Sequence, residues 1–174
     1  MPPRRRGQRT AAPSAKCDRL YHHHPPPLQG IELRTQGQVR DNPSAPGIFT
    51  VLKNGQGQAA VLNQDNSPNF GTNPAKRASF IQIYATGAGE TDPPLLPGEA
   101  APASWNPLIL TRVQPTVTIG GVQARVLFSG MAPGFVGLWQ INAEVPSSVT
   151  PGPAVSLVVT AGGVSSNTVT IAVE

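Results

Sequence analysis

Apolar and polar residues alternate through residues 115–146, with breaks at the glycine pair 120–121 and the Pro-Gly pair 133–134. Alternation with a period of two residues, interrupted by turn residues, predicts antiparallel strands that bury one face. Because glycine accepts the positive φ angles of a primed turn, the first break predicts a tight hairpin. The same pattern surrounds the glycine pair 162–163 in residues 154–173, which we expect to form the last hairpin.

The first half of the chain predicts another hairpin. Residues 47–53 and 57–63 carry strand-forming residues on either side of an Asn-Gly pair at 54–55. Asn-Gly between two such runs is a strong signal for a two-residue hairpin turn. Residues 63–77, which follow, are polar and contain turn residues, so we expect a long connection there.

Residues 79–87 predict a central strand, because both of its faces carry large side chains. Ile81 and Ile83 share one face, and Phe80 and Tyr84 share the other. Residues 89–107 contain several prolines and predict a long irregular loop. Loops of that length are commonly functional.

Short strands at this spacing, without a helical period, indicate an all-β chain folded as an immunoglobulin-like antiparallel β-sandwich. We expect one folded domain over residues 45–174. The inward positions of its strands predict a core made of Ile81, Ile83, Val117, Ile119, Val126, Phe128, Trp139, Ile141, Val145, Leu157, Val159, Val169 and Ile171.

The composition supports an all-β fold and distinguishes a basic tail from the folded domain. The chain has 18 Gly and 20 Pro in 174 residues, and charged residues make up 13%. Both Gly and Pro oppose helices and favour turn-rich β structure. Residues 1–40 carry a net charge of +6 and the remainder −2, so the basic character belongs to the start of the chain. We expect residues 1–44 to be a disordered, basic, Pro/His-rich tail.

The tail offers little chemistry of its own. A single Cys17 cannot form an internal disulfide, and His22, His23 and His24 are adjacent rather than spread over a fold that would hold a metal. Arg4–Arg6 could contact phosphates, but too few cations and aromatics are present for a nucleic-acid site. We therefore predict no metal, no cofactor and no nucleic-acid partner. No run of apolar residues is long enough to span a membrane or to form a signal peptide.

Four segments in order carry a resemblance: APGIFTVLKNGQGQAAVLNQDNSPN, NPAKRASFIQIYATGAGETDPP, TVTIGGVQARVLFSGMAPGFVGLWQINAEVP and TPGPAVSLVVTAGGVSSNTVTIAV. Together they resemble an uncharacterised C-terminal domain that recurs in large exported proteins of soil acidobacteria. More distantly, they resemble the IPT/TIG type of immunoglobulin-like domain. The resemblance covers residues 45–174 and implies an extracellular or cell-surface location. Residues 1–44 stand where members of that family have a preceding immunoglobulin-like unit.

Three residues of the Pro-rich loop are candidate ligand or partner contacts. Trp105 stands among small and polar residues, and an exposed Trp supplies apolar area and an indole donor. Glu90 and Asp92 are a pair of carboxylates, as a glycosidase requires. Acidic residues on a loop are more often solvated than catalytic. The folded part also contains no histidine for Ser-His-Asp catalysis. We therefore expect no catalytic site and no enzyme.

Oxygen-bearing side chains also alternate at Asn63, Asp65, Ser67 and Asn69. A calcium loop uses such alternation but needs more carboxylates than the single Asp65. The interpretation that we favour is a polar connection stabilised by Asx turns.

These observations lead to three hypotheses about function. The first is a non-catalytic extracellular or cell-surface module for adhesion, presentation or attachment, with a neighbouring immunoglobulin-like domain or a cell-surface polymer as its partner. The second is a polysaccharide-binding module that uses the 89–107 loop and Trp105. The third is one half of a tandem unit, truncated and without a function of its own.

Overall fold

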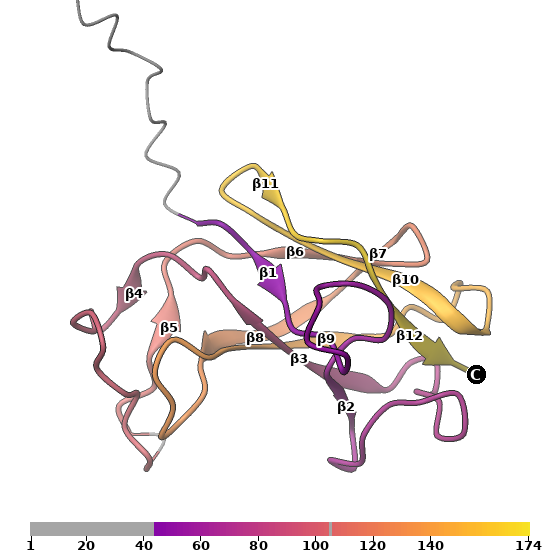
Figure 1. Ribbon diagram of the computed structural model, residues 1–174, viewed down its shortest axis with the longest axis horizontal. Helices are drawn as coiled ribbons and strands as arrows, with labels where there is room; N and C mark the ends of the chain where they lie inside the picture. Colours follow the sequence, from indigo (N-terminus) through magenta and orange to yellow (C-terminus); the bar gives the residue numbers. More distant parts are fainter. Residues whose placement is uncertain (1–43, 105) are drawn as a thin grey trace, which may run out of the picture. The chain divides into compact units, whose positions relative to one another are not determined.

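The computed structural model describes residues 44–104 and 106–174, and in this part of the chain all regular structure is β, with no helix. The strands form two antiparallel sheets that pack as a sandwich (Figure 1). This confirms the predicted all-β sandwich. Ser44, which the sequence places in the tail, is buried, and its hydroxyl donates to the carbonyl of Ala88 at 3.2 Å. Residues 1–43 of the predicted tail lie outside the described residues.

One sheet has seven strands. These are β1 (Gly47–Ile48), β2 (Val61–Asn63), β3 (Phe80–Thr86), β4 (Thr91–Asp92), β5 (Leu110–Thr111), β8 (Val126–Met131) and β9 (Trp139–Glu144). Its order is β1-β3-β9-β8-β5-β4, and β2 also pairs with β3. The predicted central strand is therefore confirmed, because β3 lies between β9 on one side and both β1 and β2 on the other.

The second sheet has five strands. These are β6 (Thr116–Ile119), β7 (Val122–Ala124), β10 (Gly152–Ala161), β11 (Val164–Ser165) and β12 (Val169–Val173). Its order is β11-β10-β6-β7, and β12 pairs with the same strand β10. The chain changes sheet between β5 and β6, between β7 and β8, and between β9 and β10, so residues 116–173 contribute to both layers, whereas β1 to β5 all belong to the seven-stranded sheet.

Two predicted hairpins are confirmed, and glycine backbone geometry explains both. The 120–121 pair joins β6 to β7, with φ angles of 58° and 78°. The 162–163 pair joins β10 to β11, with φ angles of 58° and 81°. Positive φ at both central residues defines the primed turn that matches the twist of the flanking strands, and residues with a Cβ rarely adopt it.

The predicted hairpin at Asn54-Gly55 takes a different form. β1 and β2 both pair with β3, so the chain leaves this sheet edge after residue 48 and rejoins it at residue 61. Between these points the two arms pair with each other at one bridge, Thr50 to Ala59, with backbone hydrogen bonds from Val51 to Gln58 at 3.0 Å and from Ala60 to Phe49 at 2.8 Å. Ile48 and Val61 are each buried beside β3, and this apolar burial favours pairing of both outer ends of the excursion with β3.

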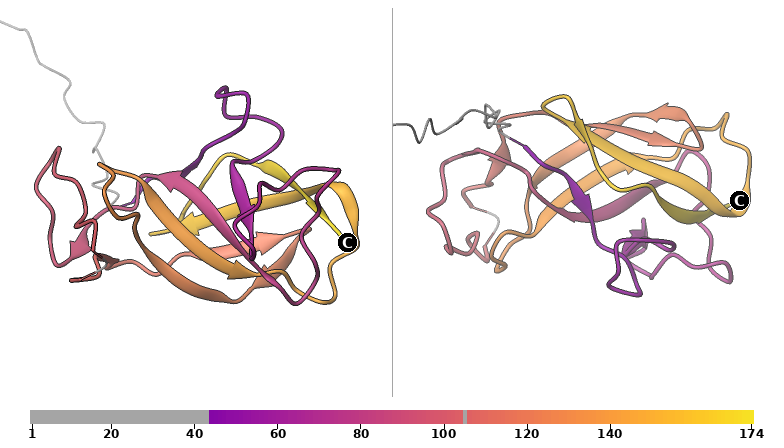
Figure 2. Two further views of the ribbon diagram at one scale, coloured as in Figure 1. Left: turned by 90° about the horizontal axis from the view of Figure 1, so that it is seen from below. Right: turned by 45° about the horizontal axis from the view of Figure 1, so that its top comes forward.

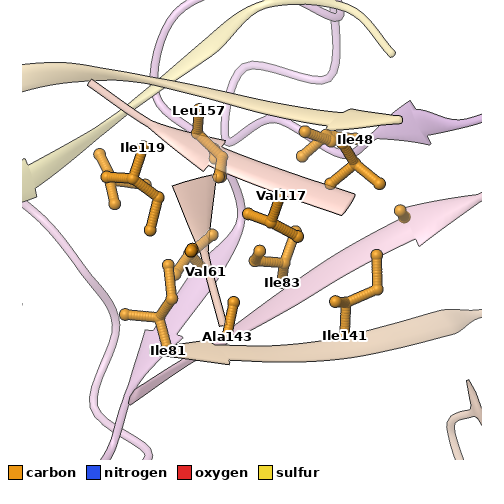
Figure 3. Packing of buried hydrophobic residues seen from close by; sticks show 14 of the residues in the cluster. Ile48, Val61, Ile81, Ile83, Val117, Ile119, Ile141, Ala143 and Leu157 are labelled. Carbon is orange, nitrogen blue, oxygen red and sulfur yellow. The ribbon is translucent and has the colours of Figure 1, made fainter. Parts of the chain in front are cut away.

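The core lies between the two sheets, and most of the predicted core residues are confirmed. Side chains from β3 and β9 face those from β6 and β10 (Figure 3). Eleven of the thirteen predicted residues are fully buried: Ile81, Ile83, Val117, Ile119, Trp139, Ile141, Val145, Leu157, Val159, Val169 and Ile171.

The prediction was wrong for Phe128, and a β-bulge is the reason. Val126 pairs with Ala143, whereas Phe128 pairs with Asn142, so two residues of β8 span one residue of β9. The extra residue reverses which face the following side chains take. Ser129 is therefore buried in the core, while Phe128 joins the opposite face of the sheet; Val126 is half-buried against the core.

Three polar groups are buried with the core in one hydrogen-bonded chain. The indole nitrogen of Trp139 donates to the Ser129 hydroxyl at 2.9 Å, and that hydroxyl lies 2.6 Å from the Thr111 hydroxyl. All three side chains are buried. The chain of bonds links β9, β8 and β5 and removes the cost of an unpaired indole donor.

Candidate functional site

Of the two acidic candidates, Asp92 lies on β4 at the edge of the seven-stranded sheet, and Glu90 directly precedes this strand. β4 pairs with β5, and Thr91 between the two acids is buried, so Glu90 and Asp92 both point to solvent. A carboxylate oxygen of Glu90 lies 3.4 Å from a guanidinium nitrogen of Arg112, and both side chains are largely exposed. An exposed ion pair of this kind contributes little to stability and does not prepare a carboxylate for catalysis.

A cleft, which we name the end cleft, opens beside Glu90. Its volume is about 600 Å³, and it lies between the residues that follow β3 and the turn that precedes β9. Glu90, Glu99 and Arg112 line it, but Asp92 does not. Glu99 already accepts a hydrogen bond from the backbone nitrogen of Leu96 at 2.9 Å. The structure therefore brings Glu90 to this cleft without Asp92, and Trp105 lies outside the described residues.

The polar alternation at residues 63–69 is used for structure. Asp65 accepts hydrogen bonds from the hydroxyl and the backbone nitrogen of Ser67, which is an Asx turn. These bonds, that of the hydroxyl first, lower the pKa of Asp65. The predicted Asx-turn interpretation is confirmed.

Asn69 completes the outer edge of β12. Its amide oxygen accepts from the backbone nitrogen of Ala172 at 2.8 Å, and its amide nitrogen donates to the carbonyl of the same residue at 2.9 Å. The amide nitrogen also donates to the side chain of Asn63 at 2.9 Å. The buried amide thus takes the place of a neighbouring peptide, and the edge of β12 is closed to further pairing there.

Asn167 lies between β11 and β12 and connects the second sheet to β1 of the first. Its amide oxygen accepts from the backbone nitrogen of Ile48 at 2.7 Å, and its nitrogen donates to the carbonyls of Ile48 at 3.1 Å and Gly55 at 2.8 Å. The two asparagines together connect the two sheets along one side of the sandwich.

The outward face of the seven-stranded sheet carries residues that sequence reasoning did not assign to a site. Strand register places them in two rows. Neighbours within a row lie on adjacent strands, where side chains are close enough to interact. One row contains Leu62, Gln82, Asn142 and Phe128, and the other contains Tyr84, Gln140, Gly130, Leu110 and Asp92.

Amide side chains in the middle of these rows form a network, which we name the amide face. It consists of Gln82, Gln140 and Asn142 together with Asn66. The Gln140 nitrogen donates to Asn142 at 3.0 Å and to Gln82 at 3.4 Å, and the Gln82 nitrogen donates to Asn66 at 2.7 Å. The Tyr84 hydroxyl donates to Gln82 at 3.3 Å. The amide face is uncharged and rich in both donors and acceptors.

A second cavity, the face hollow, lies at one side of the amide face. Its volume is about 560 Å³. Leu62, Tyr84 and Gln140 contribute to it from β2, β3 and β9, and Phe135 and Leu138 contribute from the turn between β8 and β9. Mainly apolar lining with a few polar groups, in this range of volume, is typical of sites for small ligands.

One feature of the sequence indicates the outward face of the seven-stranded sheet. Gln140 and Asn142 alternate with the buried residues of β9, as do Gln82 and Tyr84 on β3. Alternation assigns each set to an outward face, but only the register of β3 against β9 places Tyr84 beside Gln140.

Comparisons of the chain with protein-family models, with curated proteins and with solved structures each find no match. Among residues 44–104 and 106–174, no helix is long and apolar enough to cross a membrane. The same residues contain no cluster of three or more His, Cys, Asp or Glu side chains that could hold a metal ion.

Proposed function

We propose that the described part of the chain is an immunoglobulin-like module that binds a partner at a cell surface without catalysing a reaction. The order of strands supports the class. The series β1/β2-β3-β9-β8 corresponds to strands A-B-E-D of an immunoglobulin domain, and β12-β10-β6-β7 corresponds to G-F-C-C′. In this assignment, the β4–β5 pair is an addition within the B–C connection.

The position of the connections is the second support. Backbone bonds join the B–C connection to the turn between β8 and β9, from Ala101 to Phe135 at 3.1 Å and from Gly134 to Ala101 at 2.8 Å. These connections lie at one end of the sandwich, and the C terminus lies at the other (Figure 1, Figure 2). Antibody variable domains also place binding loops at one end, although this likeness of fold is an analogy rather than evidence of function.

One observation carries the proposal: the outward face of the seven-stranded sheet presents an amide network beside a cavity of ligand size. Such groups recognise a ligand by hydrogen bonds and apolar contact. Glu90 and Asp92 instead point to solvent, and Glu90 is held in an exposed ion pair. The proposed location outside the cell rests on the family resemblance of residues 45–174.

The experiment is a binding assay with a readout for turnover. The purified chain is mixed with insoluble bacterial envelope material, the bound fraction is measured by sedimentation, and released products are measured by mass spectrometry. We expect saturable binding without product release. Glu90→Gln and Asp92→Asn serve as controls that keep binding. Product release that either substitution abolishes would overturn the proposal.

A second candidate is docking of a neighbouring domain at the end cleft. Leu96 and Val136 line this cleft and are 74% and 60% exposed. Large exposed apolar side chains mark interaction surfaces when they lie together. If a tandem partner normally covers them, the isolated chain self-associates in light scattering and Leu96→Ser reduces the association. A stable monomer over a wide range of concentration argues against this candidate.

A further inference from the structure

Gln140 has an unused hydrogen-bonding group at the face hollow. The residue is 7% exposed and lines the cavity. Its amide nitrogen donates to Gln82 and Asn142, but among the described residues no donor reaches its amide oxygen. An amide oxygen can accept two hydrogen bonds, so this oxygen has acceptor capacity that the described residues do not use. The hollow therefore presents an acceptor whose own side chain is held in place.

The face hollow suits an uncharged ligand. None of its described lining residues is charged at neutral pH, since a phenol with the ordinary pKa of 10.0 is already protonated there and burial raises the pKa of Tyr84 further. Charged residues along the strands of this face include Asp92 at the end of one row and Glu144 of β9, which pairs with Arg125. An ionic ligand would lose its hydration here without gaining an opposite charge.

The amide oxygen of Gln140 also restricts the chemical class of the ligand. A free acceptor requires a donor from the ligand, and a proline-rich peptide has no N–H to supply at its prolines. A sugar hydroxyl supplies a donor and also accepts from the amide nitrogens of the network. The apolar face of a sugar ring can pack on Leu62, Leu138 and Phe135, which line the same cavity.

On these grounds, and resting on the proposed function, we propose that the face hollow binds a sugar unit of a neutral polysaccharide, with a hydroxyl group donating to the Gln140 amide oxygen. The amide face continues from the hollow across β3, β9 and β8 to Phe128. Adjacent strands lie about 4.8 Å apart, so the row from Leu62 to Phe128 extends about 14 Å. That length exceeds one sugar, and the remaining amides contact the next units of a chain.

The test is native affinity electrophoresis in gels that contain hydroxyethylcellulose, laminarin or arabinoxylan as neutral polymers, with polygalacturonate as the charged comparison. We expect at least one neutral polymer to retard the chain. Phe135→Ala removes an apolar contact with the ligand, and Gln140→Met removes the acceptor together with the two bonds that Gln140 donates within the network. Each should weaken retardation about tenfold or more, the factor expected for losing one hydrogen bond or apolar contact with the ligand. Val136→Ala is the matched control, because Val136 is adjacent and equally exposed but lines the end cleft.

The outcomes separate this inference from the proposed function. Retardation by no neutral polymer, or equal retardation of wild type, Phe135→Ala and Gln140→Met, overturns the sugar site. If envelope material still binds without turnover, the proposed function stands. Product release sensitive to Glu90→Gln overturns the proposed function instead. Phe135 is 58% exposed on a turn, so its variant keeps the test valid even if Gln140→Met does not fold.

Discussion

Replacing Asn69 by alanine tests whether one buried amide holds the two layers together at the β12 edge. The amide makes two bonds to the backbone of Ala172, one to Asn63 and one, at 3.2 Å, with Gln58. In Asn69→Ala, the Ala172 carbonyl keeps its second donor, the backbone nitrogen of Ala75, and Gln58 keeps the Asn69 carbonyl. The Ala172 nitrogen and the Asn63 amide oxygen are left without partners.

Each unpaired buried group costs about 1–3 kcal/mol, so the expected loss in free energy of unfolding is about 3 kcal/mol for the two groups together. In a urea titration with a slope of about 2 kcal/mol per M, this lowers the midpoint by about 1.5 M. The matched control is Gln64→Ala, which removes an exposed amide from the same polar connection and should cost less than about 0.5 kcal/mol.

Asn69→Asp adds a dependence on pH. The introduced carboxylate can still accept from Ala172 but faces two acceptors, the Ala172 carbonyl and the Asn63 amide oxygen. Protonation restores a donor, so folding raises the pKa of this carboxyl above its unfolded value of about 3.9. The free energy of unfolding of Asn69→Asp is therefore greatest below the unfolded pKa and falls as the pH rises through the folded-state pKa. Equal stability of Asn69→Ala and Gln64→Ala would refute the account of this edge.

Three further predictions concern other groups. Ser129→Ala leaves the buried indole nitrogen of Trp139 without an acceptor and should lower the free energy of unfolding by about 2 kcal/mol in urea titration; a loss below about 0.5 kcal/mol would contradict the hydrogen-bonded chain. Glu90→Gln breaks an exposed ion pair with Arg112 and should cost less than about 0.5 kcal/mol in thermal unfolding, so a large loss would show a role that the geometry does not predict. Tyr84 should ionise above pH 10.0 in an absorbance titration after the chain's other tyrosine is replaced by phenylalanine. Because its folded-state pKa is raised, its contribution to stability is present below the unfolded pKa and is lost as the pH rises through the folded-state pKa; Tyr84→Phe should remove that loss.

Local signals explain why much of the sandwich could be predicted. The glycine pairs at 120–121 and 162–163 favour primed turns whatever the rest of the chain does. Period-two alternation in β9 and β12 assigned their buried faces correctly. Where alternation runs without interruption, each residue's face follows from its position in the sequence.

The errors arise where a strand depends on a distant partner. The bulge in β8 inserts one residue relative to β9, and nothing in the local alternation marks it, so Phe128 was assigned to the core. The arms of residues 47–53 and 57–63 were paired with each other because the Asn-Gly signal is local, whereas the edge of β3 that both follow is not.

The candidate site was hard to predict for the same reason. Glu90 and Asp92 are candidates because they form a pair of carboxylates, and Trp105 because it stands among small and polar residues of the same Pro-rich loop. Tyr84 and Gln140 are distant in sequence, and only the register of two strands makes them neighbours. The prediction for Trp105 stays a prediction, and Trp105→Ala in the electrophoresis assay would test it.

The most direct test of the central claim is nitrogen-15 NMR of the labelled chain during titration with the neutral polymer that retards it most. The account predicts shifts of the Gln140 side-chain amide signals and of the backbone amides of Phe135 and Leu138. Glu90 and Glu99, which line the end cleft, should be unaffected. Shifts confined to Glu90 and Glu99, or an unchanged Gln140 amide at saturation, would contradict a binding site on the outward face.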